Sequence, residues 1–99
     1  MFRSKDKNEM IRRHMVFYGW VQGVGFRWRA MQAATRLGVT GWVRNDPSGS
    51  VTMELQGTQE AIDGVVLAIE QSPYISIDRM EAKTIPLKEG ERSFQPLLL

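Results

Sequence analysis

The clearest pattern near the start of the chain is an alternation of side chains from about Arg12 to Trp20, which predicts a β-strand. The period then changes, because apolar residues recur at helical spacing from Phe26 to Leu37. Gly38 follows as a typical C-terminal stop for this helix. A strand therefore leads into a helix through the short loop of residues 21–25.

The next pattern predicts a β-hairpin. Residues 39–45 are rich in β-forming side chains and end at the turn signal Asp-Pro-Ser-Gly of residues 46–49. Residues 50–56 then place an apolar side chain at every second position, which is typical of a half-buried strand.

The remaining residues predict a helix and two strands. Thr58 is a candidate N-cap for a helix with one apolar stripe, which a Ser-Pro pair ends. Residues 74–85 predict a strand, and a change of phase near Arg79 indicates a β-bulge within it. Residues 92–97 predict a short last strand, which Pro96 confines to a sheet edge.

The order of these elements predicts the α+β class. A ferredoxin-like split β-α-β sandwich, with the order βαββαβ and two helices on one face of an antiparallel sheet, buries both helical stripes. Residues 12–99 are expected to form this single domain. Residues 1–11 are charged and lack periodicity, so we expect a flexible N-terminal tail.

Composition narrows the class of protein further. The 99 residues are 42% hydrophobic and include no cysteine, which fits one globular domain without disulfides or thiolate metal sites. No apolar run reaches membrane-spanning length, and the N-terminus lacks the hydrophobic stretch of a signal peptide. We therefore expect a cytoplasmic protein that does not bind membranes.

The basic pI of about 9.3 comes mainly from the N-terminus. Residues 1–13 hold five basic and two acidic residues, a net charge of +3, whereas the rest of the chain holds eight basic and nine acidic residues, a net charge of −1. One segment without acidic residues contains four arginines: Arg27, Arg29, Arg36 and Arg44. Such a segment attracts a small anion, and no nucleic-acid partner is expected.

The loop of residues 21–25 has the features of an anion-binding site. Gly23 and Gly25 lack a Cβ, so successive N–H groups can converge on one point at the N-terminus of the helix. The guanidinium of Arg27, in the first helical turn, can hold two oxygens of a phosphate or carboxylate. The alternative is a tight turn followed by a solvated arginine.

Asn45 is a second candidate site residue. We expect the strands on either side of the first helix to run side by side, which brings the loop after the first strand near Asn45 at the end of the second. Its amide offers both donors and an acceptor, as holding a neutral water requires. The alternative is a simple turn residue before Asp46 and Pro47.

The candidate site contains no cysteine, no carboxylate pair and no metal-ligand cluster at recognisable spacing, so no residue is available to protonate a poor leaving group. The substrate then has to supply the reactivity. A substrate whose leaving group departs without a proton meets this requirement.

Two motifs in this order resemble the paired signature of the acylphosphatase family. They read Gly19-x-Val21-Gln22-Gly23-Val24-x-Phe26-Arg27 and Gly41-Trp42-Val43-Arg44-Asn45-x-x-x-Gly49-x-Val51, with Gly57 at the expected spacing. The resemblance covers about Arg12 to Leu97. It implies a hydrolase without metal or cofactor that converts a small acyl phosphate and water into a carboxylate and inorganic phosphate.

The resemblance also implies roles for individual residues. Arg27 matches the family's phosphate-binding arginine and Asn45 the asparagine that orients the attacking water, so these are the candidate catalytic residues. The candidate phosphate-binding segment consists of Gln22, Gly23, Val24, Gly25, Phe26 and Arg27.

Three residues depart from the family pattern. Phe17 stands where an aliphatic residue is usual and Trp20 where a basic or polar one is usual, which we expect to alter packing and the rim of the site. Asp46 would weaken anion binding if its carboxylate pointed inward, but a turn carboxylate more often faces water.

Other functions rank lower. A ferredoxin-like RNA-binding module shares the order of elements, but residues 50–56 lack the basic and aromatic side chains of its third strand. A non-catalytic module that binds acyl or carbamoyl phosphate is a further alternative, since similar domains begin larger carbamoyl-transferring hydrogenase-maturation proteins. A lone strand histidine such as His14 is more often structural than a nucleophile. Large aromatic side chains are expected in the core, which applies to Phe17, Trp20 and Trp42. The protein is expected to be a monomer.

Overall fold

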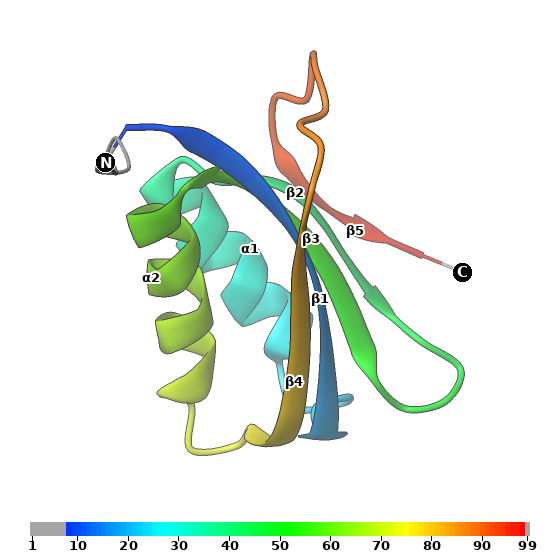
Figure 1. The fold of residues 1–99 in the computed structure, drawn as a ribbon. Coiled ribbons are helices and arrows are strands. Elements are labelled where there is room, and N and C mark those ends of the chain that lie inside the picture. The colour runs from blue at the N-terminus through cyan, green and yellow to red at the C-terminus, as the bar shows by residue number, and fades with distance from the viewer. Residues whose placement is uncertain (1–7, 99) are drawn as a thin grey trace, which may run out of the picture.

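The computed structural model describes residues 8–98, which form two helices and one five-stranded sheet. In chain order the elements are β1 (Met10–Trp20), α1 (Phe26–Leu37), β2 (Thr40–Asn45), β3 (Val51–Thr58), α2 (Gln59–Glu70), β4 (Ser76–Ile85) and β5 (Phe94–Leu97). Both helices lie on one face of the sheet (Figure 1). The predicted α+β ferredoxin-like fold is confirmed. Neither helix of the described region has the length and apolarity needed to cross a membrane.

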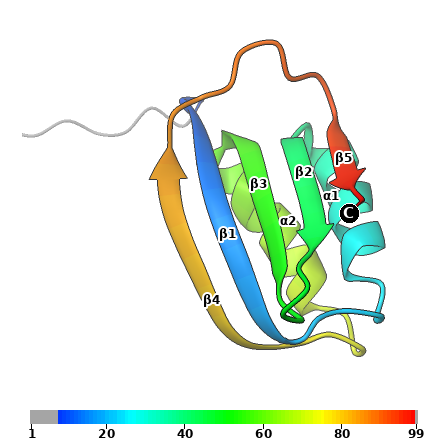
Figure 2. The same cartoon turned by 90° about the vertical axis from the view of Figure 1, so that its right-hand side faces the viewer.

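The strands lie in the order β4-β1-β3-β2-β5 (Figure 2). β3 pairs antiparallel with both β1 and β2, β4 pairs antiparallel with β1, and β5 joins β2 in parallel. The expectation that β1 and β2 run side by side is wrong, because β3 lies between them. The two strands are still parallel to each other, so the loop after β1 and Asn45 at the end of β2 lie at the same end of the sheet.

Local signals set the element boundaries. α1 spans the predicted residues, and Gly38 ends it in the left-handed conformation, with φ of 73°. Thr58 caps α2, since its Oγ1 accepts a hydrogen bond from the Ala61 amide at 3.1 Å. A register shift between β4 and β1 leaves Asp78 as an extra residue, so the predicted bulge occurs one residue before Arg79.

The core lies between the sheet and the helices. Phe17 is fully buried and meets Phe26 edge to face, with ring centroids 5.1 Å apart, so β1 packs directly against the start of α1. Trp42 is only partly buried, and Trp20 is 71% exposed, so the expectation of a core position is wrong for Trp20.

The N-terminal boundary differs from the prediction. β1 begins at Met10, two residues before the predicted strand, and Ile11 is buried in the core. Residues 1–7 of the predicted tail lie outside the described residues.

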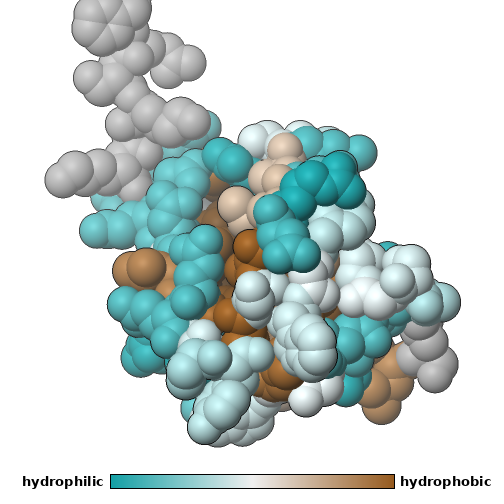
Figure 3. Space-filling view, turned by 90° about the horizontal axis from the view of Figure 1, so that it is seen from below, coloured by the Kyte–Doolittle hydropathy of each residue, from teal (hydrophilic) through white to brown (hydrophobic). Residues whose placement is uncertain are grey.

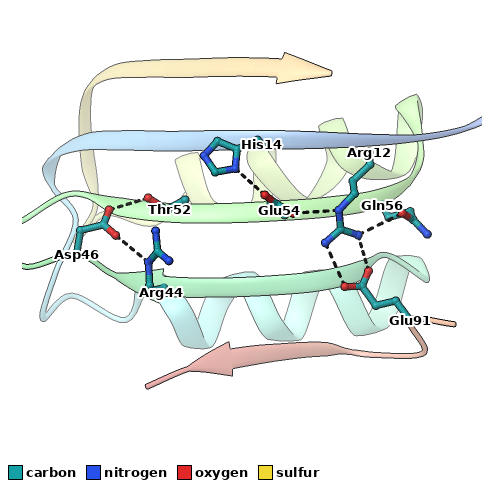
Figure 4. Close-up of polar contacts among 8 residues, drawn as sticks. All are labelled: Arg12, His14, Arg44, Asp46, Thr52, Glu54, Gln56 and Glu91. Carbon is teal, nitrogen blue, oxygen red and sulfur yellow. Dashed lines mark hydrogen bonds and ion pairs between the residues drawn. The ribbon is translucent and has the colours of Figure 1, made fainter. Parts of the chain in front are cut away.

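The face of the sheet away from the helices carries a hydrogen-bonded cluster around Arg12 (Figure 4). The buried Arg12 guanidinium donates to Glu54 Oε1 at 3.1 Å, to Gln56 Oε1 at 3.2 Å and to both carboxylate oxygens of Glu91 at 2.8 and 3.2 Å. Gln56 also bonds the backbone of Lys88 through both ends of its amide, at 2.8 and 3.0 Å. These contacts hold the loop between β4 and β5 against the sheet.

The charges of this cluster stabilise one another. Burial would raise the pKa of Glu54, but hydrogen bonds from His14, at 2.7 Å, and from Arg12 outweigh burial and lower it. Burial would likewise raise the pKa of Glu91, and the hydrogen bond from Arg12 is the main cause of its lowering. For Arg12 burial would lower the pKa, but the two carboxylates raise it. His14 is thus part of a structural cluster.

Candidate active site

The loop between β1 and α1 is a concave run of backbone amides. Gly23 and Gly25 adopt φ values of 75° and 83°, whereas the non-glycine residues of the described chain all keep negative φ. This alternation of sign turns consecutive N–H groups toward one point. A Cβ at either glycine would meet nothing within 4 Å, so the backbone conformation, not crowding, requires glycine.

The N-terminus of α1 has no competing partner. Gly25 is the N-cap without a side-chain cap bond, and the first turn contains no acidic residue. The first backbone hydrogen bond of this turn runs from Arg29 N to Gly25 O at 3.0 Å, and within residues 8–98 the amides of residues 22–27 donate none. Unpaired amides and the helix dipole therefore both favour an anion here.

Arg27 and Asn45 line one cavity of about 370 Å³, together with Gly23, Gly25 and Phe26. Small-molecule sites commonly have volumes of roughly 300–1,000 Å³. Among the described residues Arg27 makes no hydrogen bond or ion pair, so its guanidinium can pair with a ligand. The two predicted site residues, Arg27 and Asn45, thus lie in the same cavity.

The other three arginines of the basic segment do not line this cavity. Arg29 donates to Ala68 O at 3.2 Å, and Arg44 Nε donates to Asp46 Oδ1 at 3.0 Å. Arg36 lies in the last turn of α1. His14 is also absent from the lining, which leaves the nucleophile alternative without support.

Asn45 offers the cavity an acceptor. Val43 is fully buried, and Asn45 follows two residues later, so both face the helix side of the sheet. The Asn45 Oδ1 atom is buried and accepts no hydrogen bond from any described residue. Such an oxygen is costly unless a ligand or water pairs with it.

Gln22 ties the loop to the hairpin that carries Asn45. Its Nε2 donates to Asp46 O at 2.7 Å and to Ser50 O at 2.8 Å, both in the turn after β2. Sequence reasoning assigned only the backbone of Gln22 to the site and missed this side-chain role. Gln22 and Val24 do not themselves line the cavity, unlike the rest of the predicted phosphate-binding segment.

The Asp46 carboxylate points neither into the cavity nor toward water, so the expectation that it faces water is wrong. It accepts hydrogen bonds from Arg44 at 3.0 Å and Thr52 at 2.7 Å (Figure 4), and a third from Ser50 Oγ at 2.8 Å. Burial would raise the pKa of Asp46, but these three bonds outweigh burial and lower it. The carboxylate organises the hairpin turn and does not oppose an anion in the cavity.

The cavity also has an apolar side that sequence reasoning missed. Its lining includes Trp28 and Met31 of α1, and Pro96 and Leu98 at the C-terminal end. Figure 3 views the end of the molecule that carries the loop after β1, and shows apolar surface between polar side chains. The position of Trp28 and Met31 beside Arg27 in one helical turn was an available signal, whereas no local pattern connects Leu98 with α1.

The fold and this cavity together define a small α+β domain with the features of an anion-binding site. Residues 13–96 match the family model described as Acylphosphatase. An acylphosphatase of Bifidobacterium longum is 47% identical over 92 residues, which cover 91% of this chain and 95% of that protein. The chain belongs to the acylphosphatase family, and the resemblance of the two motifs is confirmed.

Solved structures agree with this family. An acylphosphatase from Coxiella burnetii superposes with a TM-score of 0.81 and 27% sequence identity. The match covers 97% of this chain and 100% of that one. Full-length HypF, solved in a phosphate- and nucleotide-bound form, matches with a TM-score of 0.80 and 27% identity. That match covers 96% of this chain but only 12% of HypF.

Proposed function

We propose that this enzyme hydrolyses a small acyl phosphate in the cavity between the loop after β1 and Asn45. The amides of residues 22–27 and the Arg27 guanidinium bind the phosphate group, and Asn45 holds the attacking water. One observation carries the proposal: a single cavity contains a guanidinium and a buried amide oxygen that both lack a partner among the described residues.

The chemistry fits the side chains present. The water oxygen attacks phosphorus while the bond from phosphorus to the acyl oxygen breaks, and the carboxylate leaves with the electron pair. The proton of the water passes to a phosphate oxygen of the substrate. Because the carboxylate needs no proton, the protein contributes positioning and charge stabilisation, which are its main contributions in phosphoryl transfer.

The test of this proposal is hydrolysis of benzoyl phosphate in the presence of EDTA, with inorganic phosphate as a competitor. Arg27→Ala is expected to lower kcat/KM by roughly 10²–10³-fold, since a preorganised donor to developing charge contributes about 2.7–4 kcal/mol. Arg27→Lys should rescue poorly, because it loses the planar fork. Arg36→Ala is the matched control, since Arg36 lies on the same helix outside the cavity. Equal activity of Arg27→Ala and Arg36→Ala would refute the assignment.

Neither alternative function is favoured. The relatives that this chain covers over most of their length are named acylphosphatases, which argues against a purely non-catalytic module. The sheet face that an RNA-binding module would use carries the cluster of Arg12, Glu54 and Glu91.

We further propose a cytoplasmic monomer that binds neither nucleic acid nor membrane. The net charge of −1 over residues 14–99 supports the absence of polyanion binding. Light scattering should give the mass of one 11.3 kDa chain, and a larger mass at micromolar concentration would contradict the monomer.

A further inference from the structure

We propose that the substrate carries an apolar acyl group, aromatic or branched aliphatic, held by a wall of four side chains: Trp28, Met31, Pro96 and Leu98. These four are called the acyl wall. The inference rests on the proposed function, because it assigns the part of the same cavity that lies beyond the phosphate-binding loop.

One side of the acyl wall continues directly from the cation. Met31 lies three residues after Trp28 and four after Arg27 on α1, so its side chain neighbours both, and all three line the cavity. Trp28 is 63% exposed although it is a large apolar side chain. Because one rigid helix carries the guanidinium and the wall, a ligand held at Arg27 extends over Trp28 and Met31.

The other side of the acyl wall comes from the C-terminal strand. β5 pairs in parallel with β2, with Pro96 opposite Val43 and Leu97 opposite Arg44. The next residue, Leu98, therefore lies beside the end of β2, where Asn45 is found. Leu98 is 78% exposed, so it also presents apolar surface to the cavity.

Two contacts fix this strand in place. Gly41 N donates to Ser93 O at 3.1 Å just before β5. The ion pair of Arg12 with Glu91, at 2.8 Å, holds the preceding loop on the sheet. Three of the four acyl-wall residues thus lie in regular structure and Leu98 directly follows β5, which favours a site of defined shape.

The chemistry of the acyl wall selects the acyl group. Its four side chains offer no charge to pair with a charged acyl group, and a ring can stack on the indole of Trp28. An acetyl group is too small to cover this surface. In a hydrophobic pocket, two substrates that differ by about one methylene differ in kcat/KM by roughly 10–200-fold. The kcat/KM for benzoyl phosphate should therefore exceed that for acetyl phosphate by about tenfold or more.

The experiment compares kcat/KM for benzoyl phosphate and acetyl phosphate in the full chain. In the parent the ratio of the two should be about ten or more. Trp28→Ala is expected to lower this ratio by about fivefold or more. Met31→Gln should lower it as well, and this variant keeps side-chain length should Trp28→Ala fail to fold. Tyr74→Ala is the matched control, because Tyr74 is 73% exposed and lies outside the cavity.

Inorganic phosphate has no acyl group, so its inhibition constant should stay within about twofold of the parent in Trp28→Ala and in Met31→Gln. If the parent hydrolyses both substrates with equal kcat/KM, or if both wall variants keep the parent's ratio, the acyl wall is overturned and the proposed function stands. If the parent hydrolyses neither substrate, the proposed function itself fails, and the acyl wall with it.

Discussion

The side-chain hydrogen bonds of Gln22 link the fold to catalysis, and this link can be tested with the variant Gln22→Ala. The Gln22 side-chain amide connects the loop after β1 to the turn after β2, at 2.7 and 2.8 Å from two carbonyl oxygens. Asn45 directly precedes that turn. We therefore expect Gln22→Ala to disturb the relative position of the bound phosphate and the attacking water, although the side chain itself does not line the cavity.

The structure sets the size of the effect on stability. The Asp46 carbonyl also accepts a hydrogen bond from the Gly49 amide at 3.0 Å, and the Ser50 carbonyl accepts one from the Asp46 amide at 2.9 Å. Truncation of Gln22 thus leaves neither oxygen without a partner. The cost is the net value of two hydrogen bonds, about 1–3 kcal/mol in the free energy of unfolding.

We expect Gln22→Ala to affect the rate of catalysis more strongly than the stability of the fold. A displacement of about 1 Å between reacting groups can reduce a rate by roughly 10²-fold, so we expect kcat/KM for benzoyl phosphate to fall by about 10- to 100-fold. Gln22→Glu keeps the volume but presents acceptors to two carbonyl oxygens, and it should lose activity like Gln22→Ala.

Gln59 provides a matched control for this variant. Its amide also makes two side-chain hydrogen bonds, from Arg13 to Oε1 and from Nε2 to Asp63, both at 2.8 Å, and it lies outside the cavity. Urea unfolding followed by tryptophan fluorescence gives stability, and initial rates give kcat and KM. If Gln22→Ala and Gln59→Ala have the same kcat/KM within twofold, Gln22 is only a structural residue and the reasoning is wrong.

Three further predictions concern the site and the fold. Asn45→Ala should lower kcat by roughly 10²-fold and keep the inhibition constant of phosphate, because the water loses its partner; a defect in phosphate affinity alone would contradict this role. The pKa values of Asp46, Glu54 and Glu91 are lowered in the folded state, so as the pH falls the unfolded chain binds protons before the folded one. The urea midpoint should therefore stay constant above the ordinary pKa values of 3.8 and 4.5 and decrease at lower pH. A midpoint independent of pH between 5 and 3 would oppose this, and Glu54→Gln should flatten the decline. Thr58→Ala should cost about 0.5–2 kcal/mol and Thr58→Ser should restore it; an unchanged unfolding curve would count against the cap.

Much of the fold and of the candidate site follows from residues that are neighbours in the chain. The bounds of α1, its end at Gly38 and the cap at Thr58 depend on backbone conformation and on bonds within a few residues. The two motifs likewise place Gly23, Gly25 and Arg27 on one loop and helix start, whatever the rest of the chain does. The sequence by itself therefore determined the family, the order of elements and the candidate phosphate-binding loop.

Only the tertiary structure decided how distant segments meet. Gln22 reaches carbonyls 24 and 28 residues away, and Arg12 pairs with Glu91 at a separation of 79 residues. The position of β3 between β1 and β2 and the approach of Leu98 to α1 depend on strand order, which no local pattern encodes. Side-chain partners of this kind are selected by packing of the whole sheet, which is why the sequence could locate the glycine loop and Arg27 but not the approach of Pro96 and Leu98 to α1.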